Sequence, residues 1–349
     1  MAIGRTFAVA AVVALNLTAL VASTGAQTSQ SSRPESVEEF YRGKQIRLVV
    51  GSDAGGGYDA YGRLVAAYMG KYIPGNPSFI VQNMAGAGSL IATNHVANVA
   101  AKDGTVIGAI HPDAVTAPLF RSDKAKYDPR KFVWLGSPVS ITYTVTVWHT
   151  APIQTFDELF SKELIVAASG GESTVLPLLA NGVLGTKFKV ITGYKSASAG
   201  FLAIERGEAQ GNGGDALNAL KSVHGDRLRD GTVRIIAAYG MKPNPELAGV
   251  PRVLDYAKTP EQREALSLVF STDDFGWPYI MAGEVPADRA RALQAAFEKA
   301  MTDKDLLADA AKRRLDISPV RAEEQAKLVV DTFNTRAEVV DKVKRMIGE

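Results

Sequence analysis

The chain has 349 residues, of which 46% are hydrophobic, and its Lys+Arg total of 39 nearly balances its Asp+Glu total of 37. A formal net charge of +2 gives no overall field that favours nucleic acid or an anionic membrane surface, so we expect a small partner. The length suits a globular protein of about two domains. Because the chain has zero cysteines, it can form no disulfide, no thiolate metal site and no cysteine nucleophile.

The first residues are typical of a secretory signal peptide. One positive charge, Arg5, precedes an apolar run over residues 7–22, and small residues follow. A retained membrane anchor would need about 20 apolar residues, and Asn16 interrupts this shorter run. We expect a signal peptide over residues 1–26 with cleavage near Ala26, a disordered polar leader over residues 27–40, and a location in the periplasm.

The segments from residue 46 to residue 110 alternate between strand and helix patterns. Short β-type runs cover residues 46–50, 78–83 and 105–110, and helical spacing of apolar residues covers 61–72 and a segment ending near 99. Strands that alternate with helices in this way predict a parallel sheet.

The rest of the chain shows a second alternating series. Residues 132–150 ("FVWLGSPVSITYTVTVWHT") are β-branched and aromatic and predict one extended strand or two in series. A strand, a glycine loop and a helix follow over residues 163–184, and further strands are expected in "KVITGY" and "VRIIAAYG". From Ala287 onward, helix-forming residues dominate.

Three consecutive glycines, residues 55–57, separate the first strand from the first helix. A phosphate-binding P-loop would need Lys and Ser/Thr directly after its last glycine, and Tyr58 excludes that reading. A dinucleotide fingerprint ending at Ala60 fits the spacing, but the second strand ends in Gln82 and Asn83 where an acid should bind the ribose. We therefore expect no nucleotide and no other cofactor.

Catalytic and metal-binding patterns are sparse. The four histidines are scattered, with no H-E-x-x-H motif and no pair at i, i+4, so we expect no metal. Ser173 in "GGEST" is not in a nucleophile elbow, because Val175 stands where that motif has glycine. A secreted hydrolase would need a nucleophile and a base together and stays as an alternative.

The physics of a glycine loop that enters a helix favours an anion. Helix-start N–H groups point outward at the positive end of the helix dipole, and glycine lets a ligand approach the backbone. The loops "AGGGYD" and "AGAGSL" follow successive strands, so they should open at the same sheet edge. The alternative is that these glycines only make tight turns. Asp59 likewise has two readings, as a helix-start residue or as a ligand contact.

Several motifs occur in a fixed order: "GKQIRLVV", "GGGYDAYGRL", "IVQNMAGAGS", "AKDGTVIGA", "YDPRKFVWLGSPVS" and "VITGYKSASAGFLAIERGEAQ". From about residue 41 to the end they resemble the Bug-type, or TctC-like, solute receptors of tripartite tricarboxylate transporters. The resemblance implies an α/β, two-lobed periplasmic binding protein fold of type II, each lobe a mainly parallel sheet flanked by helices, joined by two crossing strands. We expect lobe 1 over 41–137 and 282–349, lobe 2 over 151–265, and connections over 138–150 and 266–281.

The resemblance also implies where the ligand binds. The first lobe would contribute its two glycine loops, and His111 follows the third strand at the same edge; the second lobe would contribute a glycine loop with hydroxyls and two later segments. The expected contacts are Ala54, Gly55, Gly56, Gly57, Tyr58, Asp59, Gly86, Ala87, Gly88, His111, Gly171, Ser173, Thr174, Lys195, Ser196 and Asp215.

Four positions depart from the family pattern. Tyr58 replaces a small hydroxyl residue, Ala54 stands where proline is frequent, Gln210 stands where an acid is common, and Glu172 adds an acid beside the expected carboxylate site. A phenol at position 58 could narrow the pocket or stack on a ring. We also expect Trp277 in a strand that crosses between the lobes.

The implied function is an extracytoplasmic solute receptor. It would be a monomer with no enzymatic activity, bind a di- or tricarboxylate or an aromatic carboxylate between its lobes, and deliver it to the permease subunits of a tripartite tricarboxylate transporter. A ligand sensor that serves a signalling partner would share the same site.

Overall fold

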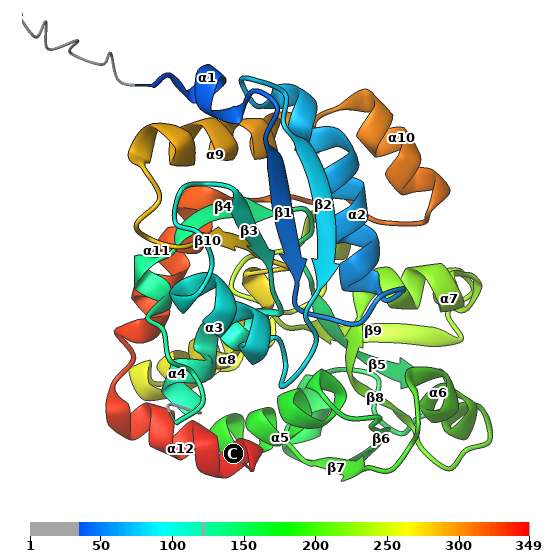
Figure 1. Cartoon of the computed structure of the whole chain (residues 1–349). Coiled ribbons are helices and arrows are strands. Elements are labelled where there is room, and N and C mark those ends of the chain that lie inside the picture. The colour runs from blue at the N-terminus through cyan, green and yellow to red at the C-terminus, as the bar shows by residue number, and fades with distance from the viewer. Residues whose placement is uncertain (1–34, 121–122, 349) are drawn as a thin grey trace, which may run out of the picture. The chain divides into compact units, whose positions relative to one another are not determined.

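Two β-sheets with helices packed against them make up the chain from Ser36 onward (Figure 1). The structure, a computed structural model, describes residues 35–120 and 123–348, and the predicted signal peptide lies outside these ranges. The first sheet contains β1 (Gln45–Val50), β2 (Ser78–Asn83), β3 (Val106–Ala109), β4 (Val133–Ser137), β10 (Tyr279–Met281) and β11 (Val320–Arg321). The second contains β5 (Tyr143–Trp148), β6 (Leu164–Ala167), β7 (Phe188–Ile191), β8 (Gly211–Ala216) and β9 (Val233–Ala238).

The helices fill the connections between these strands. In the described residues the α-helices are α1 (Val37–Tyr41), α2 (Gly57–Met69), α3 (Leu90–Asn98), α4 (Pro112–Phe120), α5 (Glu172–Leu184), α6 (Ala197–Glu205), α7 (Leu217–Arg229), α8 (Pro260–Asp274), α9 (Ala287–Met301), α10 (Lys304–Lys312), α11 (Ala322–Phe333) and α12 (Ala337–Ile347). Short 3₁₀ helices are η1 (Gly70–Tyr72), η2 (Pro129–Lys131), η3 (Asp157–Phe160), η4 (Pro245–Leu247) and η5 (Val253–Tyr256).

Each sheet is mainly parallel, and the strands that run against their neighbours are β10 and β11 in the first sheet and β5 in the second. The first sheet has the order β11-β4-β10-β3-β1-β2, with β1 parallel to β2 and β3, and β10 antiparallel to its neighbours. The second has the order β7-β6-β8-β5-β9, with β6 parallel to β7 and β8, and β5 antiparallel to β8 and β9. The predicted parallel β-α-β-α-β start and the predicted two-lobed α/β fold are confirmed.

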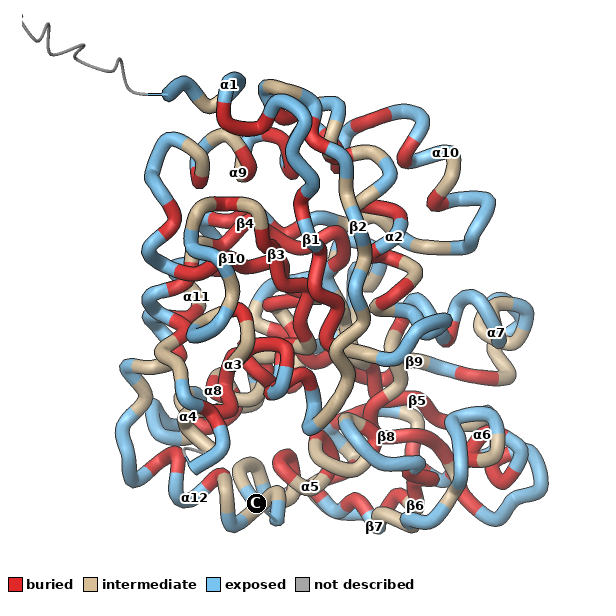
Figure 2. The backbone as a smooth tube through the Cα atoms, viewed as in Figure 1, coloured by how far each residue is buried: buried red, intermediate tan, exposed pale blue. Residues whose placement is uncertain are grey.

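Alternating side chains of the first sheet build two core layers. Leu48 and Val50 pack on one face with α2 and α9, whereas Val49 packs on the other face with α3 and α11. The central strands β3 and β10 of this sheet are buried along their whole length and are drawn in red in Figure 2, whereas the edge strand β2 is not. In the second sheet, α5, α8 and α12 cover one face, and Phe201 and Leu220 from α6 and α7 pack on the other. The lobe boundaries given above stay a prediction.

No sequence pattern indicated β8, the central strand of the second sheet. Its sequence, GNGGDA, contains residues that are depleted in strands. The structure explains the glycines, because a Cβ at Gly211 would lie 2.1 Å from the Thr146 carbonyl oxygen and one at Gly214 would lie 2.5 Å from the Glu172 carbonyl oxygen. Because β5 and α5 pack so closely against β8, these two positions require glycine. Packing therefore decides the residue type here, although glycine is depleted in strands.

Two further expectations differ from the structure. Helix α1 begins inside the segment predicted as a disordered leader, because Ser36 and Glu39 form a capping box and Tyr41 is fully buried. Trp277 lies in the loop between α8, which ends at Asp274, and β10, which begins at Tyr279, and not in a strand. No helix within the two described ranges is long and apolar enough to span a lipid bilayer.

Candidate functional site

Three loops of the first sheet meet through one hydroxyl group. The Ser89 hydroxyl donates a hydrogen bond to the Gly51 carbonyl oxygen (2.7 Å) and accepts one from the His111 N–H (3.0 Å). Gly51 follows β1, Ser89 precedes α3, and His111 follows β3. The structure thus brings both predicted glycine loops and His111 to the carboxyl edge of the parallel strands.

Asp59 holds the first glycine loop in place. Its carboxylate accepts hydrogen bonds from the Gly55 N–H, Arg63 Nε and Asn83 Nδ2, each at 2.9 Å. The residue is 3% exposed, and the hydrogen bond from Arg63, with those from Gly55 and Asn83, lowers its pKa to about 2. Asp59 is therefore engaged within the protein, while Ala54 and residues 55–57 are exposed beside it.

The second glycine loop has an unusual backbone. Ala87, Gly88 and Ser89 have φ angles of 49°, 61° and 66°, so they form a left-handed turn directly before α3. Non-glycine residues rarely adopt this conformation, and such strain is concentrated at ligand-binding segments. Gly86 is half-buried, whereas Ala87 and Gly88 are exposed at the tip.

Three aromatic rings and a histidine occupy the space in front of the first loop. The Tyr58 ring stacks on Trp277 with centroids 4.1 Å apart, and His111 lies 5.0 Å away on a tilted plane. Tyr61 meets Trp277 edge to face at 4.6 Å. Glycine is required at position 57, because a Cβ there would lie 2.9 Å from the Trp277 ring. The Tyr58 ring is therefore stacked on another ring of the protein, that of Trp277.

The glycine loop of the second sheet is closed by its own serine. The Ser173 hydroxyl donates to the Gly170 carbonyl oxygen (2.7 Å) and accepts from the Ser169 N–H (3.1 Å). Neither partner is an acid or a histidine. Gly171, with a φ of 56°, precedes α5, and its carbonyl oxygen accepts from the Thr174 N–H.

The other predicted contacts of the second lobe lie near the same sheet edge. The Ala168 N–H donates to the Ile191 carbonyl oxygen, so the loops after β6 and β7 open together. Ser196 caps α6 through the Ala199 N–H, and the exposed Lys195 has no ion pair with any described residue. No hydrogen bond within the described ranges joins these two residues to Gly171 or Thr174.

Asp215 lies at the end of β8 and is held by one donor. The Thr146 hydroxyl donates to its carboxylate at 2.8 Å. Burial raises the pKa of Asp215 to about 6, although the hydrogen bond from Thr146 acts in the opposite direction.

An acidic group that the sequence reasoning missed lies beside these loops. Asp113, Glu172 and Asp273 line a cavity of about 140 Å³, and Gly171 is the one predicted contact in its wall. Burial raises the pKa of Glu172, as does the charge of Asp113, while His111 and Tyr143 act in the opposite direction. Burial also raises the pKa of Tyr58, as do the charges of all three acids.

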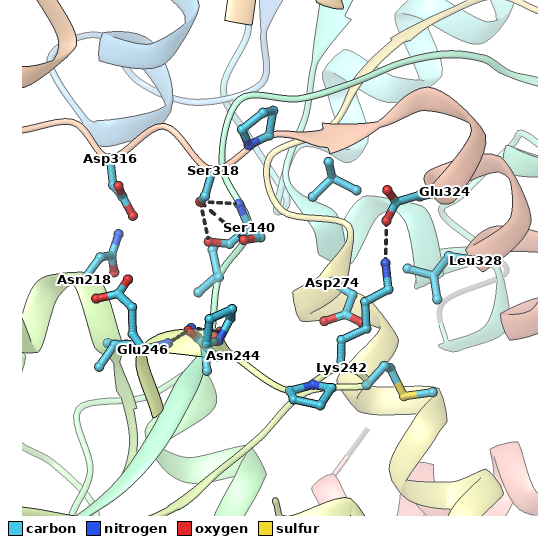
Figure 3. A pocket seen from close by; sticks show the side chains of 18 of the residues that line it. Ser140, Asn218, Lys242, Asn244, Glu246, Asp274, Asp316, Ser318, Glu324 and Leu328 are labelled. Carbon is cyan, nitrogen blue, oxygen red and sulfur yellow. Dashed lines mark hydrogen bonds and ion pairs between the residues drawn. The ribbon is translucent and has the colours of Figure 1, made fainter. Parts of the chain in front are cut away.

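A larger hollow of about 630 Å³ lies where the chain crosses between the sheets. None of the predicted contacts lines it. Ser140 and Ser318 meet in its middle, and Lys242 from the loop after β9 pairs with Glu324 from α11 (Figure 3). Burial raises the pKa of Asp274 behind this pair to about 6, and Lys242 opposes that change. This hollow thus contains ion-paired side chains from elements packed on both sheets.

Metal coordination finds no support in the geometry. In the described part of the chain, no three His, Asp or Glu side chains are grouped in a way that could hold a metal ion.

Several solved structures of periplasmic binding proteins share this architecture. No protein-family model matches the chain, and no curated protein matches it significantly. A TctC solute-binding protein from Polaromonas, solved without ligand, is 19% identical with a TM-score of 0.68, covering 86% of this chain and 99% of its own.

Two further matches were solved with dicarboxylates. MatC from Rhodopseudomonas palustris, with bound malate, is 21% identical with a TM-score of 0.55, covering 85% of this chain and 99% of its own. A second R. palustris protein, with adipate, is 20% identical with a TM-score of 0.53, covering 87% and 97%. The chain therefore has the two-lobed fold of the TctC- and Bug-type periplasmic binding proteins.

Proposed function

We propose that this protein is an extracytoplasmic solute receptor of the Bug/TctC type. It binds a small organic acid between its two lobes in the periplasm and delivers it to the permease of a tripartite tricarboxylate transporter. The lobes are those predicted above, and the site consists of the predicted loop residues. Proteins of the same fold hold malate and adipate, which supports a carboxylate ligand.

The observation that carries this proposal is the meeting of the three loops at Ser89. The two hydrogen bonds of the Ser89 hydroxyl hold three segments side by side. These are the segment that leads into the exposed glycine loop before α2, the strained turn before α3, and the segment of His111. Exposed backbone N–H groups at the start of α2 can receive a carboxylate without a dedicated arginine. The hydroxyl of Ser173 is bonded within its own loop, which tells against a serine hydrolase.

The test combines ligand binding with shape. Citrate, malate, adipate and benzoate are added to the mature protein, while melting temperature and radius of gyration are measured. We expect at least one acid to raise the melting temperature and to reduce the radius of gyration, because the lobes close by hinge motion. The absence of both effects with all four acids contradicts the proposal.

Tyr58 should influence which acid is preferred, because its ring stacks on Trp277 beside the exposed glycines. Tyr58→Thr restores the small hydroxyl of the family pattern and should change the order of preference in the same screen. Tyr68→Thr makes the same change in the same helix on the side facing α10, where Tyr68 contacts Asp309, and should keep the wild-type order. An unchanged order in Tyr58→Thr would mean that the ring does not select the ligand.

A further inference from the structure

A small cavity lies where α4, α5, α8 and α12 meet, beside the glycine loop of the second sheet. Its volume of about 140 Å³ is large compared with the roughly 10–15 Å³ that one water molecule needs. The cavity therefore has room for a small organic group. Its charged side chains are Asp113, Glu172 and Asp273, and its apolar walls include Phe120, Leu176 and Val269.

Asp273 is the buried member of the acidic group. The residue is 6% exposed, and its Oδ2 has no hydrogen-bond partner among the described residues. The charges that act on it come from Glu172, Asp274 and Asp113, and all are negative. No lysine or arginine of the described chain lines the cavity. A buried carboxylate in such surroundings is stabilised by a positively charged group, which the protein itself does not supply here.

We propose that this cavity binds the ammonium group of a short amino-bearing solute, with Asp273 and Glu172 as its contacts and Asp113 at the entrance. An ammonium group has three donors and no acceptor, which suits the Oδ2 atom of Asp273, for which the described residues supply no donor. The apolar walls suit the adjoining methylene groups. A metal ion is not favoured, because the acids are not grouped for coordination.

This inference rests on the proposed function, since Glu172 directly follows Gly171 of the loop that would contact the solute. It adds a second recognition element to that site. The exposed glycine loop of the first lobe would receive a carboxylate, and the acidic cavity would receive an amine. A solute with both groups, an amino acid with a separated amine, would then use both.

Proton release should accompany binding. Burial raises the pKa of Asp273 and of Glu172, so both tend to hold protons, and an ammonium group favours their ionised forms. The other titratable groups that interact with these two acids are His111 and Asp113 at the start of α4, Tyr58 in α2, Tyr143 in β5, Tyr239 after β9 and Asp274 in α8. Affinity for an amine should therefore rise as the pH rises.

The test uses four probes with the same carbon chain: butylamine, 4-aminobutanoate, butanoate and butan-1-ol. Calorimetric titration of the mature protein should show binding of both amino compounds, at least tenfold tighter at pH 8 than at pH 5.5, and no binding of butan-1-ol. Tighter binding of 4-aminobutanoate than of butylamine would identify an amino acid as the ligand, and equal binding would identify an amine. Both results support the ammonium site.

Two variants and one control locate the site. Asp273→Asn and Glu172→Gln should each weaken amine binding at least tenfold. Asp331→Asn changes an exposed acid that lines the larger hollow instead, and should stay within twofold of the wild type. Glu172 is only partly buried, so its variant should fold even if Asp273→Asn does not. Circular dichroism of each variant verifies that it is folded.

Two results overturn the inference: amine binding that neither variant weakens, or no amine binding at either pH. If butanoate binds and compacts the protein while amines do not bind, the ammonium site is wrong and the proposed receptor function stands. If no solute of any charge binds or changes the radius of gyration, the proposed function itself fails.

Discussion

Asp59 and Asp273 are both buried carboxylates, with 3% and 6% exposure, yet their surroundings are opposite. In the first glycine loop, three donors surround Asp59, and Arg63 lowers its pKa to about 2. In the acidic cavity, the Oδ2 atom of Asp273 has no partner within the described residues, and burial raises its pKa well above the ordinary value. A carboxylate with a full set of donors is structural, whereas one without them is open to a ligand.

The largest expected effect is the loss of the Asp59 carboxylate. Asp59→Ala should lower the free energy of unfolding by about 2–3 kcal/mol at pH 7, because three donors lose a charged acceptor. The pKa of Asp59 is lowered on folding, so its contribution is present above pH 4 and is lost as the pH falls toward 2. Urea unfolding measures the effect. Asp53→Ala, an exposed acid in the same loop, is the control and should change little; equal losses in both variants would contradict this role.

Asp273 should show the opposite sign. Its pKa is raised on folding, so its contribution to stability is present at low pH and is lost as the pH rises. Asp273→Asn should therefore raise the free energy of unfolding at pH 8 by about 1–2 kcal/mol, without a gain at pH 4. Urea unfolding at both pH values measures this. Destabilisation at pH 8 would mean that the ionised carboxylate has a partner within the protein.

Asp215 lies between these two cases, because Thr146 gives it one donor. Its pKa of about 6 lies above the unfolded value of 3.8, so the wild type should lose stability between pH 4 and pH 6 and little above pH 7. Asp215→Asn should gain about 1 kcal/mol at pH 7 and nothing at pH 4. Thermal unfolding from pH 4 to pH 8 measures the gain, and a gain already present at pH 4 would contradict a titration effect.

The smallest effect is expected at the Lys242–Glu324 pair. These side chains are 71% and 44% exposed, and exposed ion pairs contribute little to stability. Glu324→Gln should change the free energy of unfolding by less than about 0.5 kcal/mol. Urea unfolding in low and high salt measures it. A loss above 1 kcal/mol would show that this pair holds the two sheets together.

Local sequence signals predicted much of the fold. The expected strand over residues 78–83 is β2, and the apolar stripe after the glycines is α2. Such elements follow from hydrophobic periodicity and glycine positions, and both can be read within one short segment of the sequence. Strand β8 could not be predicted, because its glycines are fixed by Pro177 and by the backbone of β5 and α5.

The site was predictable only where it consists of local loops. The sequence indicated both glycine loops and the segment of His111. The acidic cavity joins Asp113, Glu172 and Asp273, which lie far apart in the chain, and their shared burial appears only after folding. One signal was available, since the adjacent acids in "STDDFGWPYIM" stand within a largely apolar segment.

The hydroxyl of Ser89 has a mechanical consequence. Ser89 is 3% exposed, and its hydroxyl forms one hydrogen bond to the segment after β1 and one to the segment after β3. Neither segment can shift relative to the other without breaking one of these two hydrogen bonds. This edge of the first sheet should therefore move as one rigid unit. Under the proposed function, adaptation to solutes of different length should then come from the angle between the two sheets, which residues 138–142, 275–278 and 334–336 connect.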